Sequence, residues 1–157
     1  MYQKIIVPLD GSELAECVLP HVRTVIKACD RSAEVLFVQA VKPLAIPYGR
    51  GETKVASIEQ LQAFEVHNQA DAEKYLEGIV ARFRKEGINA RAEVIHGQAA
   101  EAIGEFISKN NVDLVIIASH GRSGVSRLVW GSVTDRLLHS VCVPVLVVRA
   151  PGCVPNL

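Results

Sequence analysis

The sequence predicts an α/β protein made of one open, parallel five-stranded sheet with helices on both faces. Short β-branched runs alternate with longer helical stretches along the 157 residues, which is typical of a parallel sheet whose strands are joined by helices. Apolar residues make up 49% of the chain and aromatic residues only 5%, which favours a core of Val, Ile, Leu and Ala. The length suits a single domain, which we place at residues 1–150, followed by an irregular tail at 151–157.

The first strand and the first helix open the chain. Residues 4–10 (KIIVPLD) form a short β-branched run that predicts a strand. The stretch 12–29 carries apolar residues near helical spacing, and Ser12 stands where an N-cap belongs. Pro20 lies inside this stretch, and a proline within a helix predicts a kink.

A second strand and a long helix follow. The run AEVLFVQAV predicts a buried strand at 33–41, and the segment KPLAIPYGRGE predicts an exposed loop at 42–52. A long helix is expected from 57 to 86, with Gly87 as its C-cap. The residues on or near its apolar stripe are Ile58, Leu61, Phe64, Ala72, Tyr75, Leu76, Ile79 and Phe83.

The second half of the chain continues the alternation of strands and helices. We expect a strand at 89–97, a helix at 98–110, a strand at 113–119, a short helix at 132–140 and a last strand at 143–150. Parallel sheets of this kind bind ligands at the carboxyl ends of their strands, beside the point where the strand order reverses.

Charge and composition exclude several classes of partner. Lys+Arg and Asp+Glu balance at 17 each, so the chain has no general electrostatic attraction to nucleic acid or to acidic lipid. No apolar run approaches the ~20 residues of a membrane span, and the strand-like N-terminus lacks the apolar segment of a signal peptide. We therefore expect a cytoplasmic protein that binds neither nucleic acid nor membrane.

The four cysteines, Cys17, Cys29, Cys142 and Cys153, are widely spaced. They form no CxxC pair and have no histidine at ligand spacing, so reduced thiols are expected in preference to a zinc site. A domain of this size can bury enough core without disulfides, and we expect no structural role for these thiols.

The stretch ASHGRSGVSRLVWGS, at 118–132, joins the fourth strand to the next helix and carries three glycines. Glycines allow the backbone to approach a ligand closely, and the unpaired N–H groups at a helix N-terminus attract anions. Ser132 and Thr134 would add hydroxyl groups there. The pattern is neither a Walker A loop nor the GxGxxG of a dinucleotide fold. From spacing alone, a phosphate site and a simple turn are equally good interpretations, and Arg122 and Arg127 either reach phosphates or are solvated.

In this spacing and in two longer stretches, the sequence resembles the universal stress protein family over essentially its whole length. That family carries Gly-x-x-Gly, nine residues and then Gly-Ser/Thr after its fourth strand; here Gly121 is followed by nine residues and then by Gly131 and Ser132. The stretches KIIVPLDGSELAE and GSVTDRLLHSVCVPVLVV are also similar to the family's. The resemblance implies the strand order 3-2-1-4-5, in which strands one and four are neighbours and the loops that leave them line one crevice.

The resemblance also implies a nucleotide site in that crevice. Asp10 would lie near the ribose, a role that we favour over that of a turn-former whose carboxylate binds local N–H groups. Ala40 would border the adenine. The first glycine of the family's pattern is Ala118 here, which adds a Cβ where the backbone is expected to meet the ligand. The positions that match nucleotide-binding positions are Pro8, Leu9, Asp10, Ala40, Ile117, His120, Gly121, Gly131, Ser132 and Val133.

These features give a leading hypothesis and two others. The leading hypothesis is a stress-response regulatory module that binds ATP, AMP or another adenine nucleotide, with Mg²⁺ at Asp10 or a phosphate oxygen, and signals to an unidentified protein partner. The alternative is a homodimeric scaffold of the same family that binds no nucleotide. An enzyme with more than slow ATP hydrolysis is the weakest hypothesis, because the chain lacks a P-loop lysine and a Walker B aspartate pattern. A homodimer through the last strand, 143–150, is expected because an apolar edge strand invites pairing, and the resemblance points the same way.

Overall fold

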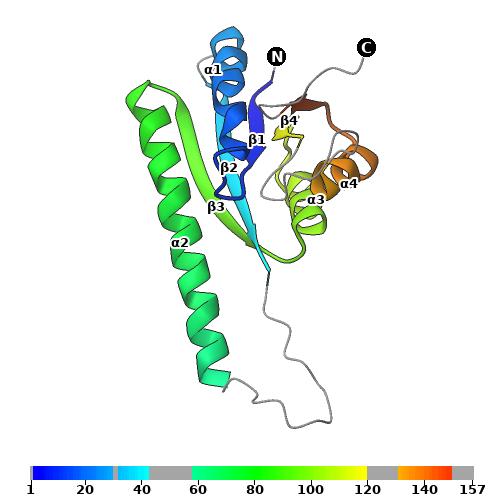
Figure 1. The fold of residues 1–157 in the computed structure, drawn as a ribbon. Helices are drawn as coiled ribbons and strands as arrows, with labels where there is room; N and C mark the ends of the chain where they lie inside the picture. The colour runs from blue at the N-terminus through cyan, green and yellow to red at the C-terminus, as the bar shows by residue number, and fades with distance from the viewer. Residues whose placement is uncertain (1, 30–31, 43–57, 120–130, 150–157) are drawn as a thin grey trace.

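The structure is a computed structural model that describes residues 2–29, 32–42, 58–119 and 131–149. Its five parallel strands form one sheet in the order β3-β2-β1-β4-β5 (Figure 1), which confirms the predicted fold class and strand order. The strands are β1 (Lys4–Pro8), β2 (Glu34–Val41), β3 (Asn89–His96), β4 (Leu114–Ala118) and β5 (Val145–Val148).

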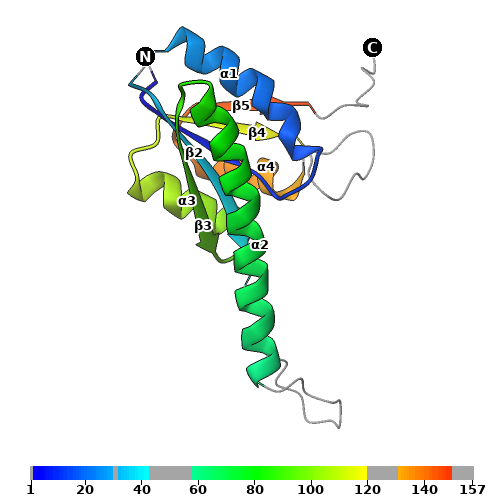
Figure 2. The same ribbon diagram turned by 90° about the vertical axis from the view of Figure 1, so that its left-hand side faces the viewer.

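Two pairs of helices cover the two faces of the sheet (Figures 1 and 2). On one face α1 and α2 pack over a buried cluster that includes Phe37 and Ile116, and on the other face α3 and α4 pack over a cluster that includes Ile6 and Leu36. The helices are α1 (Leu19–Ala28), α2 (Ile58–Lys85), α3 (Ala99–Lys109) and α4 (Ser132–Ser140), and a short 3-10 helix, η1 (Ala15–Val18), precedes α1.

The three central strands are buried on both faces, which explains why each is an almost unbroken apolar run in the sequence. β1 pairs with β2 on one side and with β4 on the other, so that Ile6 lies opposite Leu36 and opposite Val115. The carboxyl ends of β1, β2 and β4 therefore meet at one edge of the sheet.

The first α-helix begins later than the predicted start at Ser12. The Oγ atom of Ser12 accepts the N–H of Ala15 at 3.2 Å, so Ser12 caps a turn as predicted, but the α-helix begins only at Leu19. Pro20 explains the delay, because it has no N–H to donate to the carbonyl group of Glu16. That carbonyl accepts the N–H of Leu19 instead, in a 3-10 hydrogen bond. The expected kink is thus a junction between η1 and α1.

The C-terminus of α2 ends as the sequence predicts. Gly87 has a φ of 77°, a left-handed conformation that glycine adopts without strain. The N–H of Ile88 donates to the carbonyl of Phe83 at 3.1 Å, and the N–H of Gly87 donates to the carbonyl of Arg84 at 3.0 Å. These two bonds form a Schellman motif, which satisfies the last carbonyls of the helix.

The first part of α2 extends beyond the edge of the sheet (Figures 1 and 2). Between residues 63 and 71 no residue is buried, and Ala72 is the first buried residue described in the helix. Phe64 is 51% exposed, so its predicted place in the core stripe is wrong. Among the stripe residues whose side chains are described, which exclude Ile58 and Leu61, packing on the sheet begins at Ala72.

Some predicted segments lie outside the described residues. These are the predicted loop from residue 43 onward, the part of the glycine-containing stretch at 120–130, and the tail from 150 onward. Three of the cysteines, Cys17, Cys29 and Cys142, are described and carry free thiols. Within the described ranges, no helix has both the length and the apolar character needed to cross a membrane.

Candidate functional site

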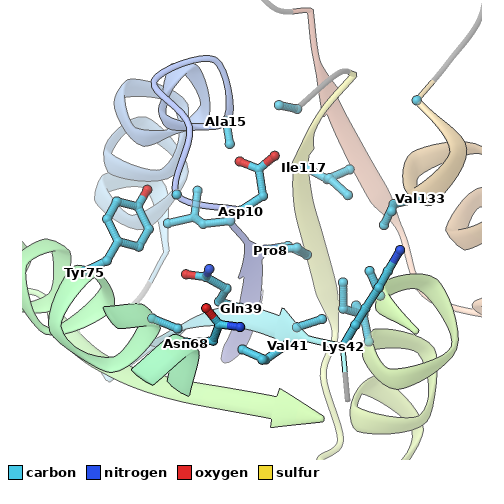
Figure 3. A pocket seen from close by; sticks show the side chains of 18 of the residues that line it. Pro8, Asp10, Ala15, Gln39, Val41, Lys42, Asn68, Tyr75, Ile117 and Val133 are labelled. Carbon is cyan, nitrogen blue, oxygen red and sulfur yellow. The ribbon is translucent and has the colours of Figure 1, made fainter. Parts of the chain in front are cut away.

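A pocket of about 940 Å³ lies at the carboxyl ends of β1, β2 and β4 (Figure 3). The chain leaves β1 toward η1 and α1 on one face of the sheet, and it enters α4 after β4 on the other face. Connections that diverge in this way leave a crevice between them, which is the usual ligand position in an open parallel sheet.

The pocket brings together most of the predicted nucleotide-binding positions, although they are far apart in the sequence. Those that line it are Pro8, Leu9, Asp10, Ala40, Ile117, Gly131, Ser132 and Val133. The other two, His120 and Gly121, lie outside the described residues.

Asp10 lies two residues after the end of β1, and its carboxylate points into the pocket (Figure 3). The Oδ1 atom accepts hydrogen bonds from the backbone N–H of Ser12 at 3.0 Å and from its Oγ at 2.6 Å. The predicted turn-forming role is therefore present in the structure. The same bonds hold the carboxylate in the wall of the pocket, so the turn and a contact with a ligand are compatible.

The N-terminal turn of α4 forms another wall. Gly131 is the N-cap, with φ −53° and ψ 143°, and its N–H donates to the carbonyl of Ser119 at 2.8 Å. This bond joins the start of the helix to the end of β4. The first N–H groups of a helix have no partner within the helix, and together with the helix dipole they favour an anion. Ser132, which is exposed, and Val133, which is half-buried, stand at this turn.

Thr134 lines the pocket, but its hydroxyl hydrogen is already used within the protein. Its side chain is buried, and its Oγ1 atom donates to the carbonyl of Ala118 at 2.9 Å. That carbonyl stands at the buried end of β4, where it needs a donor. Ala118 itself belongs to the apolar cluster beneath α1 and α2, and it also lines the pocket.

The wall supplied by α2 was not predicted. Phe64, Asn68, Asp71 and Tyr75 line the pocket from this helix, and their spacing of three to four residues places them on one face. In the sequence this face merges with the core stripe, because the two share the same period. The polar residues Asn68 and Asp71 between apolar neighbours were the signal that could have separated them.

Tyr75 fixes α2 against η1. Its hydroxyl group donates to Oε1 of Glu16 at 3.2 Å, and Arg82 lies 3.5 Å from the other oxygen of the same carboxylate. Burial raises the pKa of Tyr75 far above its ordinary value, and the charges of Glu16 and Asp10 raise that pKa further. Tyr75 is therefore a neutral hydrogen-bond donor at physiological pH.

The pocket combines surfaces of three kinds. Apolar groups of Pro8, Leu9 and Ile117 suit a planar ring, the Asp10 carboxylate suits hydroxyl groups, and the start of α4 suits an anion. Lys42 adds a cation at the end of β2. Among the residues that the structure describes, no cluster of three or more His, Cys, Asp and Glu side chains could hold a metal ion. The arrangement suits the binding of a small molecule that carries a ring, hydroxyl groups and an anionic group.

Comparison with known proteins links this chain to one family. A model of the universal stress protein family matches residues 1–149. Universal stress protein MJ0577 of Methanocaldococcus jannaschii is 28% identical over 160 aligned residues, which cover 95% of this chain and 96% of that protein. The solved structure of MJ0577 gives a TM-score of 0.81 at 26% identity, and covers 97% of this chain and 99% of that one.

Two further solved structures share the fold and contain adenine nucleotides. A universal stress protein in complex with cAMP gives a TM-score of 0.66 at 19% identity, over 95% of this chain and 98% of that one. A universal stress protein family member from Arabidopsis thaliana with AMP bound gives a TM-score of 0.68 at 14% identity, over 96% of this chain and 93% of that one. At these identities the likeness concerns the fold alone.

Proposed function

Because the chain belongs to the universal stress protein family, we propose that it is a regulatory module that holds an adenine nucleotide, ATP or AMP, in the pocket. The observation that carries the proposal is the convergence of an apolar floor, the Asp10 carboxylate and the N-terminus of α4 on one cavity. The presence of AMP and cAMP in two proteins of the same fold supports it. In this role the nucleotide would change how the protein contacts a regulatory partner in the stress response.

Each wall would contact a different part of the nucleotide. The base would lie against Ala40 and the apolar groups of β1 and β4, and Asp10 would accept hydrogen bonds from the ribose hydroxyls. The N–H groups at the start of α4, with the hydroxyl of Ser132, would bind the phosphates. Mg²⁺ would bind through the phosphate oxygens and not through Asp10, whose carboxylate is used by Ser12 and the ribose.

Rapid hydrolysis of ATP is not expected from this pocket. Hydrolysis needs a base or another group that positions water, together with cations that stabilise the transferring phosphoryl group. The carboxylates that line the described part of the pocket are Asp10 and Asp71. Asp10 is bonded to Ser12, and Asp71 lies 3.3 Å from His67 on the exposed surface of α2. We therefore propose that the nucleotide is a bound signal and is turned over slowly at most.

A homodimeric scaffold that binds no nucleotide is the second candidate. It is favoured by β5, an apolar strand at the edge of the sheet, which offers a surface for pairing whatever the pocket contains. Chromatography of the supernatant from the denatured, purified protein separates the two candidates directly, because only the first predicts a bound adenine nucleotide.

A sharper test replaces Gly131 by valine. Valine can adopt the backbone angles of Gly131, φ −53° and ψ 143°, so we expect the variant to fold. Its branched side chain would block the approach of phosphate to the helix start, and calorimetry with ATP and Mg²⁺ should show no binding. Gly78→Val is the matched control, because Gly78 lies on α2 outside the pocket and a Cβ there meets nothing within 4 Å. If Gly131→Val binds like the parent, the start of α4 does not hold the phosphates. If the parent binds no ATP at millimolar concentration, the scaffold is the better description.

A further inference from the structure

Gln39 lies where the pocket meets the packed interior. Side chains alternate between the two faces of a strand, and Phe37, two residues earlier in β2, belongs to the cluster beneath α1 and α2. Gln39 therefore points toward the same face. Gln39 lines the pocket, as does Asn68 on α2, and Figure 3 shows the two residues between β2 and α2.

The Oε1 atom of Gln39 is buried and has no hydrogen-bond partner among the described residues. Buried polar groups are almost always paired, because an acceptor that has lost water and gained no donor destabilises the structure. The terminal torsion of a glutamine is soft, so a small rotation turns this oxygen toward the cavity. A hydrogen-bond donor on a bound ligand would then pair with Oε1.

We propose that Gln39 selects the base by pairing with the exocyclic amine of adenine. Oε1 accepts a hydrogen bond from N6 and Nε2 donates one to N7, the two-bond pairing by which glutamine recognises adenine in nucleic acids. Guanine and hypoxanthine carry a carbonyl oxygen in place of this amine. Both would leave Oε1 without a donor, and they should bind more weakly. This inference rests on the proposed function and names the chemical group that the same pocket recognises.

The test compares ATP with purine riboside triphosphate, which lacks only the exocyclic amine. Calorimetry on the parent protein should show ATP binding about tenfold more tightly, the usual range for one hydrogen bond to a buried group. Gln39→Met has a similar length and no hydrogen-bonding group, and it should bind the two ligands equally. Gln69→Met is the matched control, because Gln69 lies on the same helix as Asn68 but outside the pocket and bonds to Glu73. It should keep the tenfold preference.

The outcomes separate this inference from the proposed function. If the parent binds both triphosphates equally, or Gln39→Met keeps the full preference, Gln39 does not read the amine, while nucleotide binding itself stands. If the parent binds neither ligand, the proposed function fails and this inference fails with it. The comparison of the two ligands on the parent needs no variant, so the inference can be overturned even if Gln39→Met does not fold.

Discussion

Ser132, the first residue of α4, provides the most direct test at the scale of single residues. Its side chain lines the pocket beside the N–H groups of the helix start. Ser132→Ala should weaken ATP binding by about 1–2 kcal/mol, the scale of a lost hydrogen bond to a charged group, which is roughly a five- to thirtyfold rise in Kd. Ser140→Ala, at the other end of the same helix, should bind ATP as the parent does. Equal affinities for the parent and Ser132→Ala would show that the hydroxyl does not contact phosphate.

Single residues also show where prediction from the sequence stops. Asp10 and Gly131 could be proposed for the site because one follows a strand and the other starts a helix, whereas Ala40, inside β2, was proposed only from the resemblance to the family. Thr134 was expected to offer its hydroxyl group at the helix start, and it does line the pocket, but the hydroxyl donates to the carbonyl of Ala118, a partner that only the folded structure reveals. That the Oε1 atom of Gln39 has no partner in the described part of the chain could not be predicted either, because hydrogen bonding depends on neighbours from other elements.

At the scale of the element, we expect opposite effects on stability when two glycines are replaced by alanine, Gly78 inside α2 and Gly87 just after its end. Gly87 has a φ of 77° in the Schellman motif, so Gly87→Ala should lower the free energy of unfolding by about 1 kcal/mol through backbone strain alone, since a Cβ there meets no atom within 4 Å. Gly78 lies inside the helix with equally open space, and Gly78→Ala should raise the free energy of unfolding by about 0.5–1 kcal/mol. Urea unfolding of both variants measures the difference, and a change of the same sign in both would contradict this account.

The positions of most helices and strands could be predicted from hydrophobic periodicity and from capping residues. The exceptions have physical causes. The strands and α3 and α4 lie where apolar runs and caps placed them. The start of α1 was misplaced because Pro20 removes one N–H and converts the preceding turn to a 3-10 helix. The spacing of the apolar stripe on α2 was predicted correctly, but this spacing alone does not show which turns of the helix pack on the sheet. Phe64 therefore lies in the wall of the pocket instead of in the core.

At the scale of the whole molecule, we expect a homodimer through β5. Pro144, just before this strand, accepts a hydrogen bond from Val115, and Val148 accepts one from Ser119. The alternate residues Val145 and Val147 therefore turn their N–H and C=O groups to the outer edge. A two-fold axis could pair two such edges. Light scattering at micromolar concentration should give twice the chain mass of 17.0 kDa.

A proline at the edge of β5 provides the control for this expectation. Val147→Pro removes an outward N–H, which leaves the ladder with β4 intact, and edge strands tolerate proline. The variant should be a folded monomer by light scattering and circular dichroism. A monomeric parent protein, or a Val147→Pro variant that stays dimeric, would rule out pairing through this strand.

The order of the strands could not be obtained from composition or periodicity. Alternating strands and helices are compatible with several arrangements of a parallel sheet. The order 3-2-1-4-5 was available only from the resemblance to a family, and it is the order that places the ends of β1 and β4 side by side.

The first part of α2, which extends beyond the sheet, would couple ligand binding in the pocket to the order of this helix. Phe64, Asn68 and Asp71 line the pocket from turns of the helix in which no residue is buried. A stretch of that length is a marginal helix in water unless other parts of the molecule support it. A nucleotide that touches these residues stabilises the helical form by mass action, in proportion to the logarithm of its concentration above Kd. Binding in the pocket would then make the first part of α2 more fully helical. This change would take place at a distance from the sheet and without any movement of the sheet itself.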